Sequence, residues 1–318
     1  MKIKSRERKG ASYTGILIAL VILCVVLSIA SSSFLTVTNL LNVSMQISTN
    51  FFIAVGMTFI ILLGGIDLTV GSVVAFVGLI VGLLLKAGVP VALSVLIGLV
   101  CASAIGFVTG LLITGFNLPP FIATLGMMSV VRGAAYTITG GQPIYTFPES
   151  FLVIVKRYNG VPVIALAMMA VTFLVAAYVL KYTKYGRYIY AIGGNRSCAK
   201  LSGISVKKVE CIAYVISGFC CGLAAIVLAA RLDSAVPTNA DGAEMDAIAA
   251  VVIGGTSMNG GEGSLFGTLL GIFIIGVIAN GMNLLNVPQG AQKMVKGIII
   301  VLAVVIDVIR RKRAEKAK

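Results

Sequence analysis

The chain has 318 residues, of which 58% are hydrophobic and only 11% are charged, and its mean hydropathy is +1.05. Soluble domains carry roughly 25% charged residues, so this composition excludes a soluble globular protein. It predicts an all-α integral membrane protein in which residues 1–318 form a single transmembrane domain. The net charge of +14 gathers beside the apolar segments, which is typical of membrane orientation and argues against nucleic-acid binding.

Apolar segments separated by polar, glycine or proline breaks predict about ten transmembrane helices. They lie at about 15–29, 47–63, 71–85, 90–114, 121–139, 161–180, 211–230, 247–256, 265–282 and 295–309. Residues 1–32 have the basic start and apolar centre of a signal peptide, but a polytopic chain follows, so we interpret them as an uncleaved first span. Residues 34–44, FLTVTNLLNVS, suggest an interfacial or re-entrant link before the second span.

Two glycine-rich breaks interrupt the apolar segments: GGIDLTVGS at residues 64–72 and GGTSMNGGEGS at residues 254–264. Broken helices at membrane depth often mark transport sites, whereas the same sequences also suit tight turns at the cytoplasmic surface. The sequence leaves both interpretations open. Neither break has the lysine of a GxxxxGK[ST] phosphate loop, so we do not expect the chain to bind ATP by that route.

Asp67 and Arg132 are the charges most deeply placed in apolar sequence, where a charge is costly unless it is paired or hydrated. Asp67 suits a turn or cap, and Arg132 suits either a substrate contact or an internal ion pair or carbonyl clamp. Amide and hydroxyl side chains suit a path for a neutral, hydroxyl-rich solute, although they also join helices. The candidate path residues are Gln46, Asn50, Asp67, Thr124, Arg132, Asn280 and Asn283.

The longest polar interruption, at residues 181–209, holds seven basic residues and no acidic ones. Asn195 is suited to cap a short helix over residues 196–202, and Gly203 to end that helix in a left-handed conformation. So short a helix is marginal alone in water, and we hypothesise that a cytoplasmic partner holds it. An ordinary loop whose charge sets the topology is the alternative.

Three clusters of basic residues predict how the chain is oriented across the membrane. Residues 1–12 carry five Lys or Arg, residues 181–209 carry seven, and residues 307–318 carry six. With a cytoplasmic amino-terminal tail, ten spans place all three clusters, including the tail at 310–318, on the cytoplasmic side. An eight-span topology with two re-entrant segments has the same parity. In both, the loop at 231–246 lies outside with four acidic residues: Asp233, Asp241, Glu244 and Asp246.

The residues that catalysis and metal binding most often use are sparse. The chain has no histidine, and its six cysteines include no CxxC pair, so we predict neither a metal site nor a catalytic site. HExxH and GxSxG motifs are also absent, which argues against an intramembrane enzyme.

Taken together, several stretches resemble the permease subunit of ribose-type ABC importers, within the branched-chain amino acid and sugar permease superfamily. They are FLTVTNLLN, AVGMTFIILLGGIDLTVGS, FIATLGMMSVVRG, GRYIYAIGGNRSCAKLSGISV, EMDAIAAVVIGGTSMNGGEGS followed by GTLLG, and NGMNLLNV with the closing KG…AVVID. They run in order from about Phe34 to Asp307. The set is specific to this group, although no single stretch is.

The resemblance implies a permease dimer of identical or homologous subunits, a cytoplasmic ABC ATPase that often carries two fused cassettes, and an extracytoplasmic sugar-binding protein. The loop at 231–246, with the four acidic residues named above, becomes the expected docking surface for the binding protein. Cys198 departs from the family pattern, which bears on which ATPase is accepted. The residues implied in ATPase coupling are Gly186, Arg187, Tyr188, Gly193, Gly194, Asn195, Ala199, Leu201, Ser202, Gly203 and Ile204.

The implied function is inward transport of a monosaccharide, ribose or a similar pentose or hexose, by alternating access across the bacterial cytoplasmic (inner) membrane. The chain itself is expected to bind no cofactor, because ATP and Mg²⁺ belong to the partner ATPase. Two alternatives remain. One is the same architecture for a nucleoside, a branched amino acid or a furanone signal, and the other is an ion-coupled secondary sugar carrier.

Overall fold

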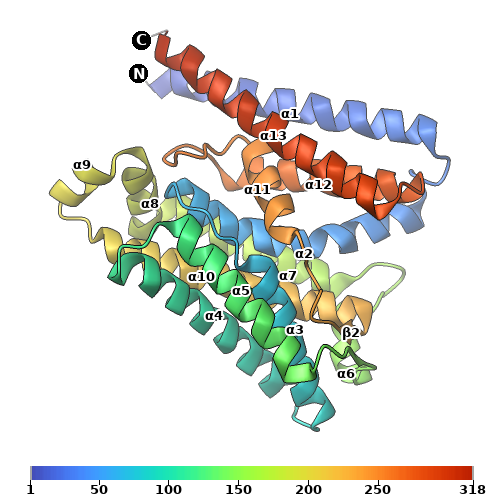
Figure 1. Cartoon of the computed structure of the whole chain (residues 1–318). Helices are drawn as coiled ribbons and strands as arrows, with labels where there is room; N and C mark the ends of the chain where they lie inside the picture. Colours follow the sequence, from blue (N-terminus) through green and yellow to red (C-terminus); the bar gives the residue numbers. More distant parts are fainter. Residues whose placement is uncertain (1, 317–318) are drawn as a thin grey trace.

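The computed structural model describes residues 2–316, and it describes the side chains of residues 13–305 and 307–309. Within these residues the chain is a helical bundle with one small antiparallel sheet (Figure 1). The elements are α1 (Lys2–Ala30), α2 (Val37–Leu62), α3 (Val70–Lys86), α4 (Val91–Gly115), α5 (Pro120–Thr139), β1 (Ile144–Tyr145), α6 (Glu149–Leu152), the 3₁₀ helix η1 (Val153–Val155), α7 (Val163–Tyr182), α8 (Lys184–Gly194), α9 (Arg196–Leu201), α10 (Val206–Leu232), β2 (Ser234–Ala235), α11 (Ala243–Ile253), α12 (Leu265–Leu284) and α13 (Gln289–Lys316).

Seven described helices are long and apolar enough to cross a membrane: α1, α2, α4, α5, α7, α10 and α12. The helix α13 has 28 residues, whereas α3 has 17 and α11 has only 11. At 1.5 Å per residue α11 is about 17 Å long, which is too short for a hydrocarbon core about 30 Å thick. The prediction of a full span at residues 247–256 is therefore wrong. This pattern of long and short helices is closer to the eight-span alternative than to ten full spans.

Two connections differ from the prediction. Residues 37–44 of the predicted link are the first turns of α2, because no proline interrupts the sequence before Leu62 and Thr36 caps the helix by accepting a hydrogen bond from Asn39 N. Residues 184–194 form the unpredicted helix α8. Its Ile189 and Ile192 are buried, so packing on the bundle stabilises a helix that the polar sequence did not indicate.

The helices α2 and α10 form the centre of the bundle, and both are largely buried. The helix α10 runs antiparallel to α4, since Gly106 packs against Tyr214 whereas Ala102 packs against Gly218. A Cβ on either glycine would overlap a carbonyl oxygen of the facing helix. Small residues therefore set this close spacing, as is usual where lipid offers no hydrophobic force between helices.

Each of the two central helices is followed by a non-helical segment that turns back into the bundle. After α2, residues 63–69 return to the middle of α10, where Asp67 accepts a hydrogen bond from Ser217 Oγ at 2.8 Å. After α10 and β2, residues 236–242 return to the middle of α5, where they contact Arg132. The short helices α3 and α11 begin at the ends of these returns.

The two returning segments meet inside the bundle. A Cβ on Gly71, in the first turn of α3, would overlap the carbonyl oxygen of Ala240, just before α11. The short helices α3 and α11 therefore start close together in the interior. Irregular backbone at such a depth is tolerated where protein or a watery cavity surrounds it.

The described ends of the chain share one end of the bundle. The beginning of α1 and the end of α13 lie at the same end as α8 and α9 (Figure 1). The opposite end carries α6 and the sheet, in which Ile144 pairs with Ala235 and Tyr145 with Ser234. The chain segments that hold the three basic clusters are thus together, which is the arrangement that the predicted topology needs.

Candidate functional site

The helix predicted after Asn195 is present as α9. The Asn195 side chain accepts a hydrogen bond from Cys198 N at 2.9 Å, and Gly203 has a left-handed φ of 79°. Ala199 is buried against the bundle, whereas Leu201 is 88% exposed. One face of α9 therefore packs on the bundle, and the other exposes an apolar side chain.

The other predicted coupling residues divide into attached and exposed groups. Gly186 is buried at the start of α8, where a Cβ would overlap the carbonyl oxygen of Leu180. Arg187 and Tyr188 are exposed on α8. After α9, the Ser202 hydroxyl donates to Cys198 O at 2.9 Å, and Ile204 N donates to Ala199 O at 3.1 Å.

Side-chain contacts attach α8 and α9 to the start of α10. The Arg196 guanidinium forms two hydrogen bonds to the buried Glu210 carboxylate, with Nη2 at 2.9 Å from Oε2. The Tyr185 hydroxyl donates to Val209 O at 2.9 Å, and burial raises the pKa of this phenol above its usual range. A bidentate charged pair fixes orientation as well as distance, so it ties α9 to the start of α10.

The end of α8 contacts the end of α2 and the second glycine-rich break. Gly193 fits so closely that a Cβ there would overlap the Leu62 carbonyl oxygen and Gly261 N, and these two atoms are hydrogen-bonded to each other at 2.9 Å. Gly260 likewise lies against Gly64. We call this meeting of three glycine pairs, at residues 64–65, 193–194 and 260–261, the glycine junction. The junction favours the tight-turn interpretation for residues 254–264, whereas residues 64–72 start at the junction and then return to the interior, where Asp67 contacts Ser217.

A tyrosine of α8 reinforces the glycine junction. The Tyr190 hydroxyl donates to Gly263 O at 3.2 Å, and burial raises the pKa of Tyr190. The sequence analysis identified each of these glycine pairs separately, but it did not predict that they contact one another. The sequence contains five Gly-Gly pairs, at residues 64–65, 140–141, 193–194, 254–255 and 260–261, and nothing local indicates which of them meet, although missing side chains let backbones touch.

Two candidate path residues instead stabilise the local structure. Asp67 is buried and accepts hydrogen bonds from Thr69 N at 3.0 Å, Thr69 Oγ1 at 2.6 Å and Ser217 Oγ at 2.8 Å. This is the turn role that the sequence suggested. The Thr124 hydroxyl donates to Pro120 O within α5 at 2.8 Å. Neither side chain is placed to contact a solute in this conformation.

Arg132 forms a carbonyl clamp. Its Nη1 donates to Pro237 O at 2.6 Å and to Asn239 O at 2.9 Å, which fixes the segment that leads into α11. This was one of the two interpretations left open by the sequence. The guanidinium is thus satisfied by backbone oxygens, and it positions the acidic residues that follow.

Charged side chains gather around the start of α11, which lies between α5 and α13 in Figure 1. Lys296 Nζ is 2.7 Å from Asp246 Oδ2, and Asn50 Nδ2 is 3.4 Å from the same oxygen. Lys293 Nζ is 3.3 Å from Asp241 Oδ2. The central polar cluster, as we name it, comprises Asn50, Arg132, Asp241, Glu244, Asp246, Lys293 and Lys296.

Two charged side chains of the central polar cluster are exposed. Lys293 and Asp241 are 75% and 67% exposed at their side chains, although they flank the interior pair of Asp246 and Lys296. Charged groups that are accessible beside membrane helices need water or a polar surface rather than lipid tails around them. The face between α5 and α13 therefore borders an aqueous space or another protein.

The four predicted docking residues do not form one surface. Asp246 is only 8% exposed, so the structure contradicts a docking contact for it. Asp233 ends α10 in a left-handed conformation, and its Oδ1 accepts a hydrogen bond from Phe147 N at 2.7 Å. Glu244 is half-buried, and Asp241 is the exposed member of the four.

The remaining candidate amides lie toward the end of the bundle opposite α8 and α9. Asn280 exchanges hydrogen bonds with Asn39 at 3.0 and 2.9 Å, which joins α12 to α2. Gln46 and Asn283 line a polar cavity of about 510 Å³ that also contains Arg157 and Arg231. Sequence reasoning missed these two arginines because each lies at the edge of a predicted span.

The fold and these sites define the class: a multi-pass helical membrane protein with a polar interior and a helical segment attached at one end. The family model described as "Branched-chain amino acid transport system / permease component" matches residues 39–304. The chain therefore belongs to this permease family, and within it to the ribose-type permeases of ABC importers. This confirms the resemblance seen in the sequence.

Three relatives illustrate the similarity. The ribose import permease protein RbsC of Escherichia coli K12 is 44% identical over 92% of both chains. RbsC of Bacillus subtilis 168 is 42% identical over 97% of this chain and 98% of the relative. The D-allose transport system permease protein AlsC of E. coli K12 is 37% identical over 93% and 91%. No solved structure matches the chain.

Membership of this family indicates the chain's role as a subunit and the kinds of partner it works with. The chain is a transport permease subunit and not a catalytic enzyme. A permease of an ABC importer works with an ATPase and a substrate-binding protein.

Proposed function

We propose that this chain is the membrane subunit through which ribose, or a similar pentose or hexose, enters a bacterial cell across the inner membrane. The observation that carries the proposal is the 42–44% identity to ribose import permeases over more than 90% of both chains. The similarity to a D-allose permease keeps hexoses among the candidates.

The central polar cluster is the candidate lining of the path. It supplies carboxylates, ammonium groups and an amide, which can replace the hydration of a polyhydroxylated solute. A second permease subunit, identical or homologous, facing the surface between α5 and α13 would keep these exposed charges away from lipid. The passage would then lie between the two subunits.

In this proposal the segment α8–α9 is the contact for a cytoplasmic ABC ATPase, with the exposed Leu201 toward the partner. ATP and Mg²⁺ stay on that ATPase, which can carry two fused cassettes. A movement of α9 would reach α10 through Arg196 and Glu210, and both glycine-rich breaks through the glycine junction. The bundle would thereby alternate between outward and inward openings.

The sugar-binding protein would dock at the end of the bundle opposite α8 and α9. Of the four acidic candidates, Asp233 lies at that end beside the sheet, whereas Asp241, Glu244 and Asp246 belong to the central polar cluster. Selectivity then rests mainly with the binding protein, since the permease must release the sugar as well as accept it.

Uptake into proteoliposomes tests the proposal. The permease is reconstituted with its ATPase, ATP and the loaded binding protein, and radiolabelled ribose uptake is measured. We expect uptake only when all three partners are present, and none when an ion gradient replaces ATP. Uptake by the permease alone under a proton or sodium gradient would show a secondary carrier instead. Competition by unlabelled ribose, allose, a nucleoside and leucine identifies the solute class.

A further inference from the structure

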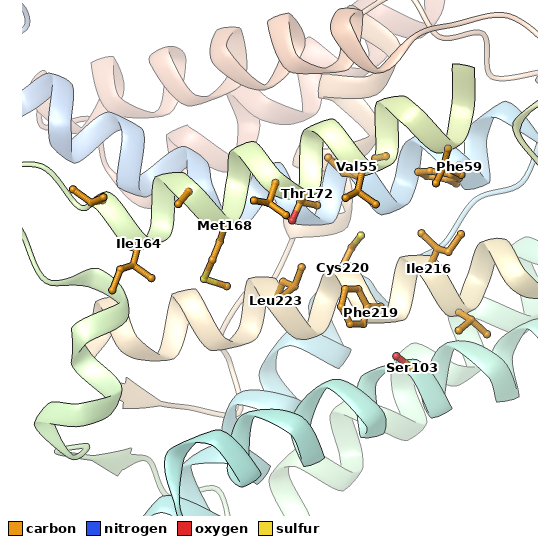
Figure 2. Close-up of a pocket in the computed structure, with 17 residues that line it drawn as sticks. Val55, Phe59, Ser103, Ile164, Met168, Thr172, Ile216, Phe219, Cys220 and Leu223 are labelled. Atoms are coloured by element: carbon orange, nitrogen blue, oxygen red, sulfur yellow. The ribbon is translucent and has the colours of Figure 1, made fainter. Parts of the chain in front are cut away.

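The helix α7 lies at the edge of the bundle. Only 17% of its apolar window is buried, compared with 67% for α10 beside it. Between these two helices lies an apolar groove with a volume of about 860 Å³, lined also by α2 (Figure 2). Figure 2 shows Met168 of α7 opposite Leu223 and Phe219 of α10 across this space.

The shape and chemistry of the groove fit a hydrocarbon chain. Its lining on α7 extends from Val163 to Val179, a length of about 24 Å at the helical rise, and it runs along the helices. Ser103 and Thr172 contribute the only hydroxyl groups among its described lining residues. An empty apolar space of this size inside a membrane would leave many side chains without contacts.

A polar cavity lies farther along the same helices. It is the cavity of about 510 Å³ that holds Arg157, Arg231, Asn42, Gln46 and Asn283, and none of the described residues that line it is acidic. Arg231 lies eight residues beyond Leu223 on α10, which is about 12 Å. Arg157 belongs to the connection that leads into α7.

The two arginines are fixed in position. Arg157 Nη2 donates to Asn42 Oδ1 at 2.6 Å, and Arg231 Nη1 donates to Met45 O at 2.9 Å. A guanidinium has five N–H donors, so each one keeps further donors for an anion. With two positive charges, three amides and no carboxylate, the cavity is complementary to a negatively charged headgroup.

We propose that one anionic phospholipid binds between α7 and α10, with an acyl chain in the apolar groove and its phosphate near Arg157 and Arg231. The groove and the cavity share walls on α2 and α10, and the connection into α7 runs from Val155 and Arg157 at the cavity to Val163 and Ile164 at the groove. The bound lipid stabilises α7, whose last turn leads directly into α8.

Tryptophan fluorescence tests this site, because the chain contains no tryptophan. Phe219→Trp puts a single reporter in the groove, and Leu174→Trp puts a matched one on an exposed part of α7 that does not line it. Each variant is reconstituted in mixtures of phosphatidylcholine and dibrominated phosphatidylglycerol. The reverse mixtures, with brominated phosphatidylcholine, are measured alongside.

At Phe219→Trp we expect quenching to favour phosphatidylglycerol by about fivefold or more, since each basic residue near a headgroup contributes about that factor. At Leu174→Trp quenching follows the bulk lipid composition. The preference is expected to fall about fivefold when R157Q is added to the groove reporter. Arg157 is exposed, so this variant is expected to fold even if R231Q does not.

Three results would overturn the proposal. A groove reporter that no brominated lipid quenches would mean that protein fills the space. Equal preference at the two reporters would mean ordinary boundary lipid. A preference that R157Q leaves unchanged, in protein with the same unfolding temperature, would mean that the headgroup binds elsewhere.

Discussion

Gly193 is the residue on which the proposed transmission depends most directly. It is the point where the α8 backbone touches Leu62 and Gly261, whereas the neighbouring Gly194 has free space around its Cβ position. A substitution at Gly193 can therefore be compared with the same substitution at Gly194 as its control.

We expect Gly193→Ala to abolish coupled sugar uptake and to lower the free energy of unfolding by about 1–3 kcal/mol, because the added methyl forces two backbones apart. Gly194→Ala is the control and is expected to keep both properties near wild type. The measurements are ATP-driven uptake in proteoliposomes and thermal unfolding in detergent. Equal behaviour of the two variants would contradict a role for the glycine junction.

A substitution at Gly203 tests whether the backbone conformation at the end of α9 matters for coupling. Its φ is 79° and no atom lies within 4 Å of a Cβ placed there, so a substitution adds strain but no collision. We expect Gly203→Val to cost at least about 1–2 kcal/mol locally and to uncouple ATP hydrolysis from uptake, with normal expression. Gly203→Asn should be milder, because asparagine tolerates the left-handed region. Normal sugar-stimulated ATPase and uptake in Gly203→Val would count against this.

At the scale of elements, the junction between α2 and α12 is a polar one. Asn39 and Asn280 exchange two hydrogen bonds in the interior, and such pairs contribute about 0.6–1.7 kcal/mol between membrane helices.

A double-mutant cycle measures this contribution. We expect Asn39→Leu and Asn280→Leu each to destabilise the protein, and the double variant to lose less than the sum of the two. The readout is the midpoint of thermal unfolding at fixed detergent and lipid concentration. Strict additivity would show that the two amides do not interact, and uptake that fails in the double variant while stability is kept would return Asn280 to the path.

Local signals in the sequence were sufficient for α9. A capping asparagine, six residues with neither glycine nor proline, and a glycine at the left-handed position lie close together, so the segment was predicted with both its ends. The helix α8 has no such signal in its own sequence. Ile189 and Ile192 make it helical by packing against the bundle, and that contact depends on residues far away in the chain.

The candidate site was predictable only in part for the same reason. The carbonyl clamp of Arg132 was foreseen as an option, because a buried arginine must satisfy its donors. Its partners, Pro237 and Asn239, lie more than 100 residues away, and nothing local points to them. The burial of Asp246 was likewise hidden, since its partner Lys296 lies on another helix.

For the whole molecule, we propose a topology in which α8, α9 and the described ends of the chain face the cytoplasm, where an ATPase can reach α9. Cys198 is the exposed one among the chain's six cysteines and lies on α9 itself. It is therefore a native reporter of which side this segment faces.

The most direct test is labelling of Cys198 with a membrane-impermeant maleimide in vesicles of known orientation, with Cys198→Ser as the control. We expect rapid labelling in inside-out vesicles, none in right-side-out vesicles, and protection when the ATPase is bound. Labelling from the outside of intact cells would put α9 on the wrong side of the membrane and contradict the account.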